Sequence, residues 1–258
     1  MKKAQSLITC ALLLAVAGIS VVQAAEEGRK EGKATVRSVR GKVEYNDHGN
    51  WLPLKPNMKF ASGISFRTGP DGVADISVNG LSSAVRITNA TILEIKDMSY
   101  VGSAREGDTT TMLNLTSGTV LGNVKKITAN SRYEITTPHG VAGIRGTDYY
   151  VSHIKIGENQ YQTTFGSVSG IVQATALVGD KMQTHTLTSQ NYWTVGEPVK
   201  PMNPVDVQNL QFQFNSLNIN TTITPPPPGP TGGTGGTGTG GTTPPPFNAG
   251  PPQGQPAS

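Results

Sequence analysis

Apolar and polar residues alternate with a period of two in several short stretches of the chain. At 73–78 the apolar Ala74, Ile76 and Val78 occupy every second position, with acidic or hydroxyl residues between them. The same alternation recurs at 39–45, 91–97 and 112–115, and turn sequences such as GPDG (69–72) and NG (79–80) separate such stretches. Alternation bounded by turn residues is typical of half-buried strands. The pattern therefore predicts an all-β domain.

A glycine that leads into a valine recurs at irregular intervals along this domain. The three triplets are Gly41-Lys42-Val43, Gly118-Thr119-Val120 and Gly166-Ser167-Val168. A chain that turns at each of these glycines would wind its strands into coils. We therefore expect an irregular wound β architecture, a short β-solenoid or roll, with a β-sandwich as the alternative.

One late segment departs from the strand pattern. Asn203 is a good helix cap, Pro204 suits the first helical position, and Val207, Leu210 and Phe214 follow at nearly helical spacing. The pattern predicts a short helix in the C-terminal extension at 201–220.

Both ends of the chain differ in composition from the domain between them. Residues 1–24 have a charged start, an apolar stretch and a small-residue site after Ala24, which predicts a cleaved secretory signal. A lipoprotein modified at Cys10 and an uncleaved anchor are the alternatives. Residues 221–258 are mostly proline, glycine and threonine, and we expect this tail to be disordered. Between them we expect a linker at 25–33 and a β domain at 34–200.

Loss of the signal would change both charge and cysteine content. The chain has 21 basic and 17 acidic residues, and removal of Lys2 and Lys3 leaves 19 basic residues and a net charge of +2. That balance does not favour a nucleic-acid partner, which selects a concentrated basic face. Cys10 is the single cysteine, so the mature chain would have no disulfide or thiolate metal site. We expect no cofactor, and no membrane span in the mature chain.

The stretch TPHGVAGIRGTDYYV at 137–151 carries three glycines at a spacing of three. A dinucleotide loop needs G-x-G-x-x-G before a helix, whereas here a strand follows, so we interpret the glycines as structural. We expect Arg145, between Ile144 and a glycine, to be partly buried with a carboxylate or carbonyl partner, and Thr147 to satisfy a local backbone group. The positions to which we assign a structural role are Thr137, Pro138, Gly140, Gly143, Arg145, Gly146, Thr147, Tyr149 and Val151.

Other side chains with catalytic or binding chemistry are scattered. No catalytic or metal-ligating spacing can be recognised among the four histidines, of which we expect His153 to face the core. We interpret the carboxylates at Asp71, Asp75 and Asp148 as turn and surface groups. Trp51 and Trp193 each lie near a proline and polar residues, which suits a half-exposed core residue or a contact residue. The histidines are His48, His139, His153 and His185.

The motif at 137–151 resembles the signature of the FecR domain family, in which Thr-Pro, small and apolar residues, Arg-Gly-Thr and an aromatic strand follow in order. RTGPDGVADISVNG, VRGKVEY and FGSVSGIV resemble other segments of that family, so the resemblance spans about 34–199. It implies an all-β, extracytoplasmic domain. In the best-known members the domain follows an anti-sigma region and one membrane helix, and it relays a signal from an outer-membrane receptor. Here we expect only a signal peptide before it, so anti-sigma activity does not carry over.

Two functions fit these observations. The first is a non-catalytic exported module of a Gram-negative-type envelope, in the periplasm or at the surface, that binds another envelope protein in signalling or assembly. The second is a structural envelope or surface protein attached through its low-complexity tail. We expect no enzyme activity, because no acid–base pair or activated nucleophile can be assembled at a recognisable spacing.

Overall fold

The structure is a computed structural model that describes residues 28–78, 83–103, 107–125 and 127–218. The predicted signal peptide with Cys10, the turn at 79–80 and the tail at 221–258 lie outside the described residues. Within the described part of the chain, no helix is both long and apolar enough to cross a membrane.

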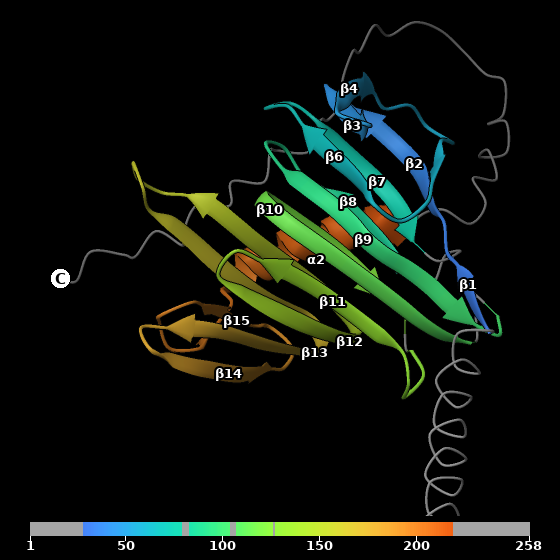
Figure 1. Ribbon diagram of the computed structural model, residues 1–258. Coiled ribbons are helices and arrows are strands. Elements are labelled where there is room, and N and C mark those ends of the chain that lie inside the picture. The colour runs from blue at the N-terminus through green and yellow to red at the C-terminus, as the bar shows by residue number, and fades with distance from the viewer. Residues whose placement is uncertain (1–27, 79–82, 104–106, 126, 219–258) are drawn as a thin grey trace, which may run out of the picture.

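The domain is all-β, as predicted, and one helix follows it in the described residues (Figure 1). The first strands are β1 (Arg29–Glu31), β2 (Ala34–Arg40), β3 (Val43–Asp47), β4 (Asn50–Pro53), β5 (Lys59–Phe60), β6 (Ile64–Thr68), β7 (Val73–Val78), β8 (Ser83–Ile87) and β9 (Ile92–Val101). The later elements are β10 (Asp108–Val124), β11 (Arg132–Thr137), β12 (Gly140–Lys155), β13 (Tyr161–Val178), β14 (Lys181–Leu187), β15 (Asn191–Thr194), β16 (Lys200–Pro201) and α2 (Pro204–Asn218).

All these strands belong to one hydrogen-bonded sheet, which folds into two layers. Its longest strands bend, so that one half of each lies in the first layer and the other half in the second. The first half of β10 pairs with β9 and β11, and its second half, from Gly118 onward, pairs with β8 and β12. Likewise, β12 pairs with β11 only through residues 140–143 and with β10 only through 148–153. The first layer thus contains β3, β4, β6, β9, β11, β14 and the adjoining halves of β10, β12 and β13. The second layer contains β2, β7, β8, β15 and the remaining halves.

Glycines mark some of the corners between these layers. Gly41, between β2 and β3, has φ 62°, and Gly118, in the middle of β10, has φ 93°. A Cβ at Gly118 would collide with Thr91, so this corner requires glycine. The predicted single strand at 39–45 is therefore wrong, because the chain turns at Gly41. Gly166 lies inside β13, and the corner of that strand is at Gly170, φ 80°.

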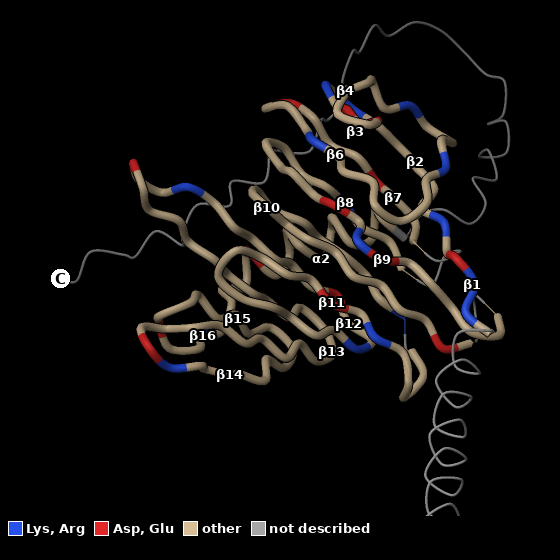
Figure 2. Tube along the Cα trace, viewed as in Figure 1, with Lys and Arg blue, Asp and Glu red and all other residues tan. Residues whose placement is uncertain are grey.

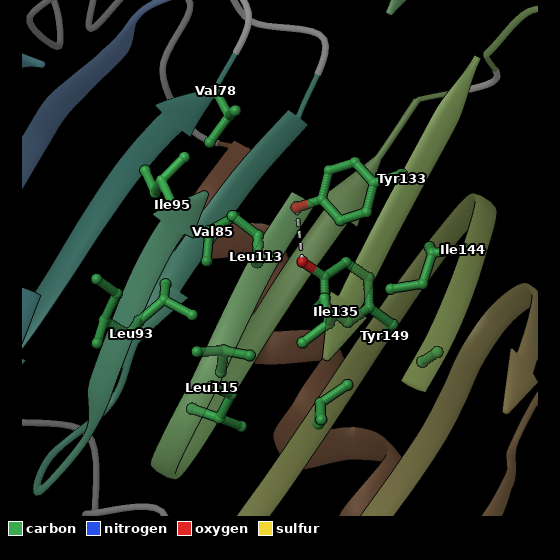
Figure 3. Packing of buried hydrophobic residues seen from close by; sticks show 14 of the residues in the cluster. Val78, Val85, Leu93, Ile95, Leu113, Leu115, Tyr133, Ile135, Ile144 and Tyr149 are labelled. Atoms are coloured by element: carbon green, nitrogen blue, oxygen red, sulfur yellow. Dashed lines mark hydrogen bonds between the residues drawn. The ribbon is translucent and has the colours of Figure 1, made fainter. Parts of the chain in front are cut away.

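The solenoid form of the prediction is not confirmed. Coils of a β-helix stack their strands in parallel, whereas every ladder between described strands is antiparallel except the one between β10 and β11. The two layers face each other instead, and their inward side chains form one buried cluster. Figure 3 shows Leu113 and Leu115 of the first layer in this cluster with Val78 and Val85 of the second. The arrangement is closer to the alternative, a sandwich.

The helix predicted near residue 203 is present as α2, and it covers the outer side of the second layer (Figure 1). The Asn203 side chain accepts the backbone N–H of Asp206 at 2.8 Å, which caps the first turn. The apolar side of α2 forms a second buried cluster, separate from the core between the layers. Its members are Ala84, Leu121, Val168, Met202, Val207, Leu210, Phe214 and Leu217.

Candidate interaction surface

The motif at 137–151 folds as a tight hairpin followed by a bent strand. Thr137 pairs with Gly140 across a two-residue turn made by Pro138 and His139, and the Thr137 hydroxyl donates to the Gly140 carbonyl at 3.0 Å. A Cβ at Gly140 would lie 2.7 Å from the carbonyl oxygen of Thr175 on β13. Close backbone approach therefore accounts for this glycine, as expected.

A bulge bends β12 and β13 together. The register between them shifts after Arg145 and again after Asp148, so residues 146 and 147 lie opposite Gly170. Gly146 has φ 57°, as predicted for this position. The Thr147 hydroxyl oxygen lies 2.7 Å from the Arg145 carbonyl and 2.9 Å from the Ile171 carbonyl, and it accepts the Ile171 N–H at 3.1 Å. Thr147 thus joins the two strands where the ordinary ladder is broken, which confirms that its hydroxyl serves the backbone.

Two expectations for the motif are wrong. Gly143 has neither a positive φ nor an atom closer than 3.9 Å to an added Cβ, so nothing in its surroundings requires glycine. Arg145 has a carbonyl partner as expected, through a hydrogen bond from Nη2 to the Ala129 carbonyl at 3.2 Å, but it is exposed and not partly buried. It points outward because inward positions of this strand belong to Ala142 and Ile144, and the alternation places Arg145 on the other face.

Among the residues that the structure describes, the buried arginine is Arg86, on β8. Its Nε and Nη2 donate to the two carboxylate oxygens of Asp75 at 2.7 and 2.9 Å, and both residues are at most 9% exposed. The interpretation of Asp75 as a surface carboxylate is therefore wrong, whereas Asp71 is exposed in the turn as expected. Sequence reasoning missed the pair although Arg86 lies between Val85 and Ile87, with Asp75 across a hairpin. Because α2 covers this side of the second layer, both faces of β7 are buried.

Asp148 also serves a structural role. It lies within β12 at the bulge, is half-buried, and accepts hydrogen bonds from the side chains of Asn123 and Ser169. Its carboxylate therefore secures the bend between β12, β10 and β13 rather than lying free at the surface. Beyond the bend, Tyr149 and Val151 are fully buried, as predicted for a core strand. The Tyr149 hydroxyl meets that of Tyr133 at 2.8 Å (Figure 3).

The bend turns the outer side of β13 and β14 toward solvent. Arg145 lies directly opposite Ile171 in the ladder, and Leu177 lies opposite Met182 near the β13–β14 turn. Side chains two residues apart on a strand share a face, so these groups and the residues between them form one surface. We call it the β13–β14 face: Arg145, Ile171, Gln173, Thr175, Leu177, Met182, Thr184 and Thr186.

This face carries three exposed apolar side chains among uncharged polar ones, and its arginine is its one charged residue. Ile171, Leu177 and Met182 are 51%, 57% and 66% exposed. On β14 the only charged residue is Lys181, at the tip beside the turn (Figure 2). Among the described strands, β14 pairs with β13 alone, so its other edge has no strand neighbour. An open edge beside exposed apolar side chains is a surface suited to strand addition.

The histidines have unlike surroundings. His153 is 3% exposed, as expected for a core position, and its Nδ1 lies 2.8 Å from the Thr163 hydroxyl. Burial, and then the charge of His139, lower the pKa of His153 below its ordinary value. His48 is exposed in a turn, and His185 packs against the Trp193 ring. In the described residues no three His, Cys, Asp or Glu side chains are grouped so as to hold a metal ion.

The two tryptophans differ from each other in burial. Trp193 is fully buried, and its indole N–H donates to the Glu197 carbonyl at 2.9 Å, so it is a core residue and cannot be a contact residue. Trp51 is half-buried on β4, with the Arg67 guanidinium 4.3 Å from its ring centroid. Trp51 therefore remains a candidate contact residue, at the far end of the first layer from the β13–β14 face.

Comparison with known proteins finds a family that the central part of the chain matches. Residues 65–173 match the family model described as FecR protein. Over these residues the chain is similar to a FecR domain. The match includes the bulge of β12 and the start of the β13–β14 face, and it confirms the resemblance seen in the motif at 137–151.

Two crystal structures of a proposed anti-sigma factor from Parabacteroides distasonis ATCC 8503 are similar to this chain. The first has 10% sequence identity and a TM-score of 0.42, and the match covers 57% of this chain and 64% of that one. The second has 12% identity and a TM-score of 0.36, with 50% and 55% covered. The chain thus matches less than two thirds of the length of either. The comparison with curated proteins gives no match.

Proposed function

We propose that this protein is a non-catalytic, exported binding module of the bacterial envelope, and that it holds an envelope protein through the β13–β14 face. The observation that carries the proposal is the exposed pair of Leu177 and Met182, which lie opposite each other on β13 and β14 beside the open edge of β14. Ile171 is exposed on the same face farther along β13. Neighbouring apolar side chains exposed on a rigid sheet are typical of protein contacts. The FecR domain supports a role in signalling, and envelope assembly is the other setting in which such a module would act.

The chemistry of the face defines the partner segment. An extended segment that adds to β14 would gain backbone hydrogen bonds, and alternate side chains would cover Leu177 and Met182. The Arg145 guanidinium donates one hydrogen bond, from Nη2 to the Ala129 carbonyl. Its other N–H groups can therefore donate to a carboxylate of a partner. We therefore expect a partner strand with apolar residues at alternate positions. Because Arg145 on β12 would lie three strand spacings, about 14 Å, from that added strand, we expect its acidic contact to come from another part of the partner.

The test compares two pairs of substitutions in the full chain. Leu177→Glu with Met182→Glu places charge on the β13–β14 face, whereas Val205→Glu with Phe212→Glu places it on α2 at side chains that are 64% and 61% exposed. Crosslinking in cells of the source bacterium, followed by mass spectrometry, should identify a partner that the first pair loses and the second retains. Equal retention by both pairs would contradict the proposed surface, and equal loss would show a non-specific effect of charge.

Export can be tested by mass spectrometry on the same cells. The sequence predicts a mature start at Ala25, so the intact mass of the protein from the envelope fraction should correspond to residues 25–258. A lipid-modified Cys10, or a retained first segment, would overturn this assignment.

A structural role through the tail is the second candidate. Residues 221–258 contain two large apolar side chains, Ile223 and Phe247, among prolines, glycines and threonines, a composition suited to an extended attachment segment. Deletion of 222–258 separates the two functions. Loss of the crosslinked partner on deletion would favour attachment through the tail, and its retention would favour the β13–β14 face.

A further inference from the structure

Basic residues are concentrated at the start of the described chain. Residues 28–60 contain eight basic and three acidic side chains, a net charge of +5. The described residues between 61 and 218 contain nine basic and eleven acidic ones, a net charge of −2. The modest net charge of the whole chain therefore conceals two regions of opposite sign.

Two strands place lysines next to each other where the sheet ends beyond β2. Lys59 of β5 pairs with Thr35 of β2, and Lys33 lies two residues before Thr35, so both lysines project from one face. The Asn57 N–H donates to the Val36 carbonyl at 2.8 Å, which holds the turn before β5 against β2. Lys59 thus has a fixed position beside Lys33.

Three more basic side chains extend this row. Lys55 precedes the same turn, and Arg29 and Lys30 lie on β1, just ahead of Lys33. Figure 2 shows blue segments along one side of the molecule, from the loop after β4, past β2, to β1. All five side chains are exposed. We call this surface the basic edge: Arg29, Lys30, Lys33, Lys55 and Lys59.

Nearby carboxylates neutralise little of this charge. Glu31 is the one acidic residue among 29–33 and 55–59. Arg29 has an ion pair with Asp97 at 3.9 Å, between side chains that are 55% and 33% exposed. The four lysines of the basic edge form no ion pair with a carboxylate of the described residues. Their ammonium groups are therefore available to an anionic partner.

Exposed aliphatic side chains lie at both ends of the basic edge. Val101 is 44% exposed and pairs with Arg29 in the ladder between β1 and β9. Leu52 is 38% exposed on β4, three residues before Lys55. Basic groups beside exposed aliphatic ones suit an anionic lipid surface, because the charges meet phosphates and the aliphatic groups enter the headgroup boundary.

We infer that the basic edge binds an anionic phospholipid surface. Complementarity of charge sets the sign of the partner, and Leu52 and Val101 favour lipid over a soluble polyanion. A lysine ammonium is a point charge on a flexible stem, which suits a fluid layer of phosphates better than one ligand of fixed shape. The basic edge shares no residue with the β13–β14 face, so this inference does not depend on the proposed partner.

Vesicle sedimentation tests the inference on the protein purified from cells, whose first residue the intact mass defines. The protein should sediment with vesicles of equal parts phosphatidylcholine and phosphatidylglycerol, and not with phosphatidylcholine alone. Salt at about 1 M, where the Debye length is only about 3 Å, should release it. Equal binding to both kinds of vesicle, or no binding to either, would overturn the inference.

Matched pairs of substitutions locate the contact. Lys33→Gln with Lys59→Gln removes two charges from the basic edge, whereas Lys155→Gln with Lys181→Gln removes two exposed charges elsewhere. At about fivefold per lysine, the first pair should lower the affinity for the mixed vesicles about 25-fold. The second pair should leave it nearly unchanged. Equal loss in both pairs would show an effect of net charge alone and contradict the proposed edge.

Soluble polyphosphate distinguishes lipid from other anions. Leu52→Ser should weaken binding to the mixed vesicles and leave binding to polyphosphate unchanged, because the polymer has no acyl boundary. Polyphosphate binding as tight as vesicle binding, with no effect of Leu52→Ser on either, would make the partner a soluble polyanion and overturn the inference. Lys30→Gln with Lys55→Gln is a second pair at the basic edge, and retained vesicle binding in a folded edge pair would also contradict it.

Discussion

The ring of His139 lies edge-on against the ring of His153, with centroids 5.0 Å apart and planes at 90°. These residues are close although His139 precedes the first residue of β12 and His153 lies near its end. A straight strand would hold them apart by more than ~40 Å. The bend at Gly146 and Thr147 folds the two halves of β12 over each other, so the histidine pair closes one end of the sandwich. Tyr161 completes this closure, stacked on His153 with centroids 5.1 Å apart.

Acid should destabilise the protein through this contact. Burial and His139 hold the pKa of His153 below the ordinary value of 6.5, so the folded state binds this proton less well than the unfolded state. The corresponding stability is fully present above pH 6.5 and is lost as the pH falls through the lowered pKa. The denaturant concentration at the midpoint of unfolding should fall as the pH is lowered from 7.5 to 5. This dependence on pH should be weaker in His153→Gln. A pH dependence in His153→Gln equal to that of the wild type would contradict the assignment.

The bulge of β12 should tolerate no branched side chain at Gly146. At φ 57° a valine is strained, and we expect Gly146→Val to lower the free energy of unfolding by about 1–3 kcal/mol. Gly143→Ala is the matched control, because that position has no positive φ and no close neighbour. Thermal melting of both variants checks the prediction, and a melting temperature for Gly146→Val equal to that of Gly143→Ala would refute it.

Replacement of Arg86 should destabilise the fold, whereas replacement of Arg145 should affect partner binding. Arg86→Ala leaves the buried Asp75 carboxylate without its bidentate partner, and removal of one member of such a pair costs about 3–5 kcal/mol. Arg145→Ala removes one exposed hydrogen bond to a carbonyl and should leave the melting temperature almost unchanged while weakening capture of the partner. A large fall in stability for Arg145→Ala would restore the structural interpretation of that residue.

These arginines also show where prediction from the sequence ends. Alternation is a local property, so it located the strands at β7 and β9 and the inward direction of Tyr149 and Val151. Which half of a strand pairs with which neighbour depends on contacts far apart in the chain, so the division of β10 and β12 between two layers was not predicted. Arg86 and Asp75 lie on the outer face of the second layer, and only the presence of α2 over that face makes them buried. The β13–β14 face has no sequence motif, because its residues stand out only by their exposure to solvent in the folded structure.

The hydroxyl of Thr147 should contribute more to the free energy of unfolding than its methyl group does. Two backbone carbonyls and one N–H group surround its oxygen within 2.7–3.1 Å, and the residue is 1% exposed. Thr147→Val keeps the shape but leaves the Ile171 N–H without this acceptor, at a cost of about 1–3 kcal/mol for a buried unsatisfied group. Thr147→Ser keeps the hydroxyl and should lower the free energy of unfolding by less, because it removes only a methyl group. Urea unfolding should therefore rank wild type above Ser and Ser above Val, and amide exchange at Ile171 should accelerate in the valine variant alone. If Thr147→Val were as stable as Thr147→Ser, the hydroxyl bridge would not be the contact that keeps the two halves of β12 folded over each other. Backbone geometry and packing would then hold the bend.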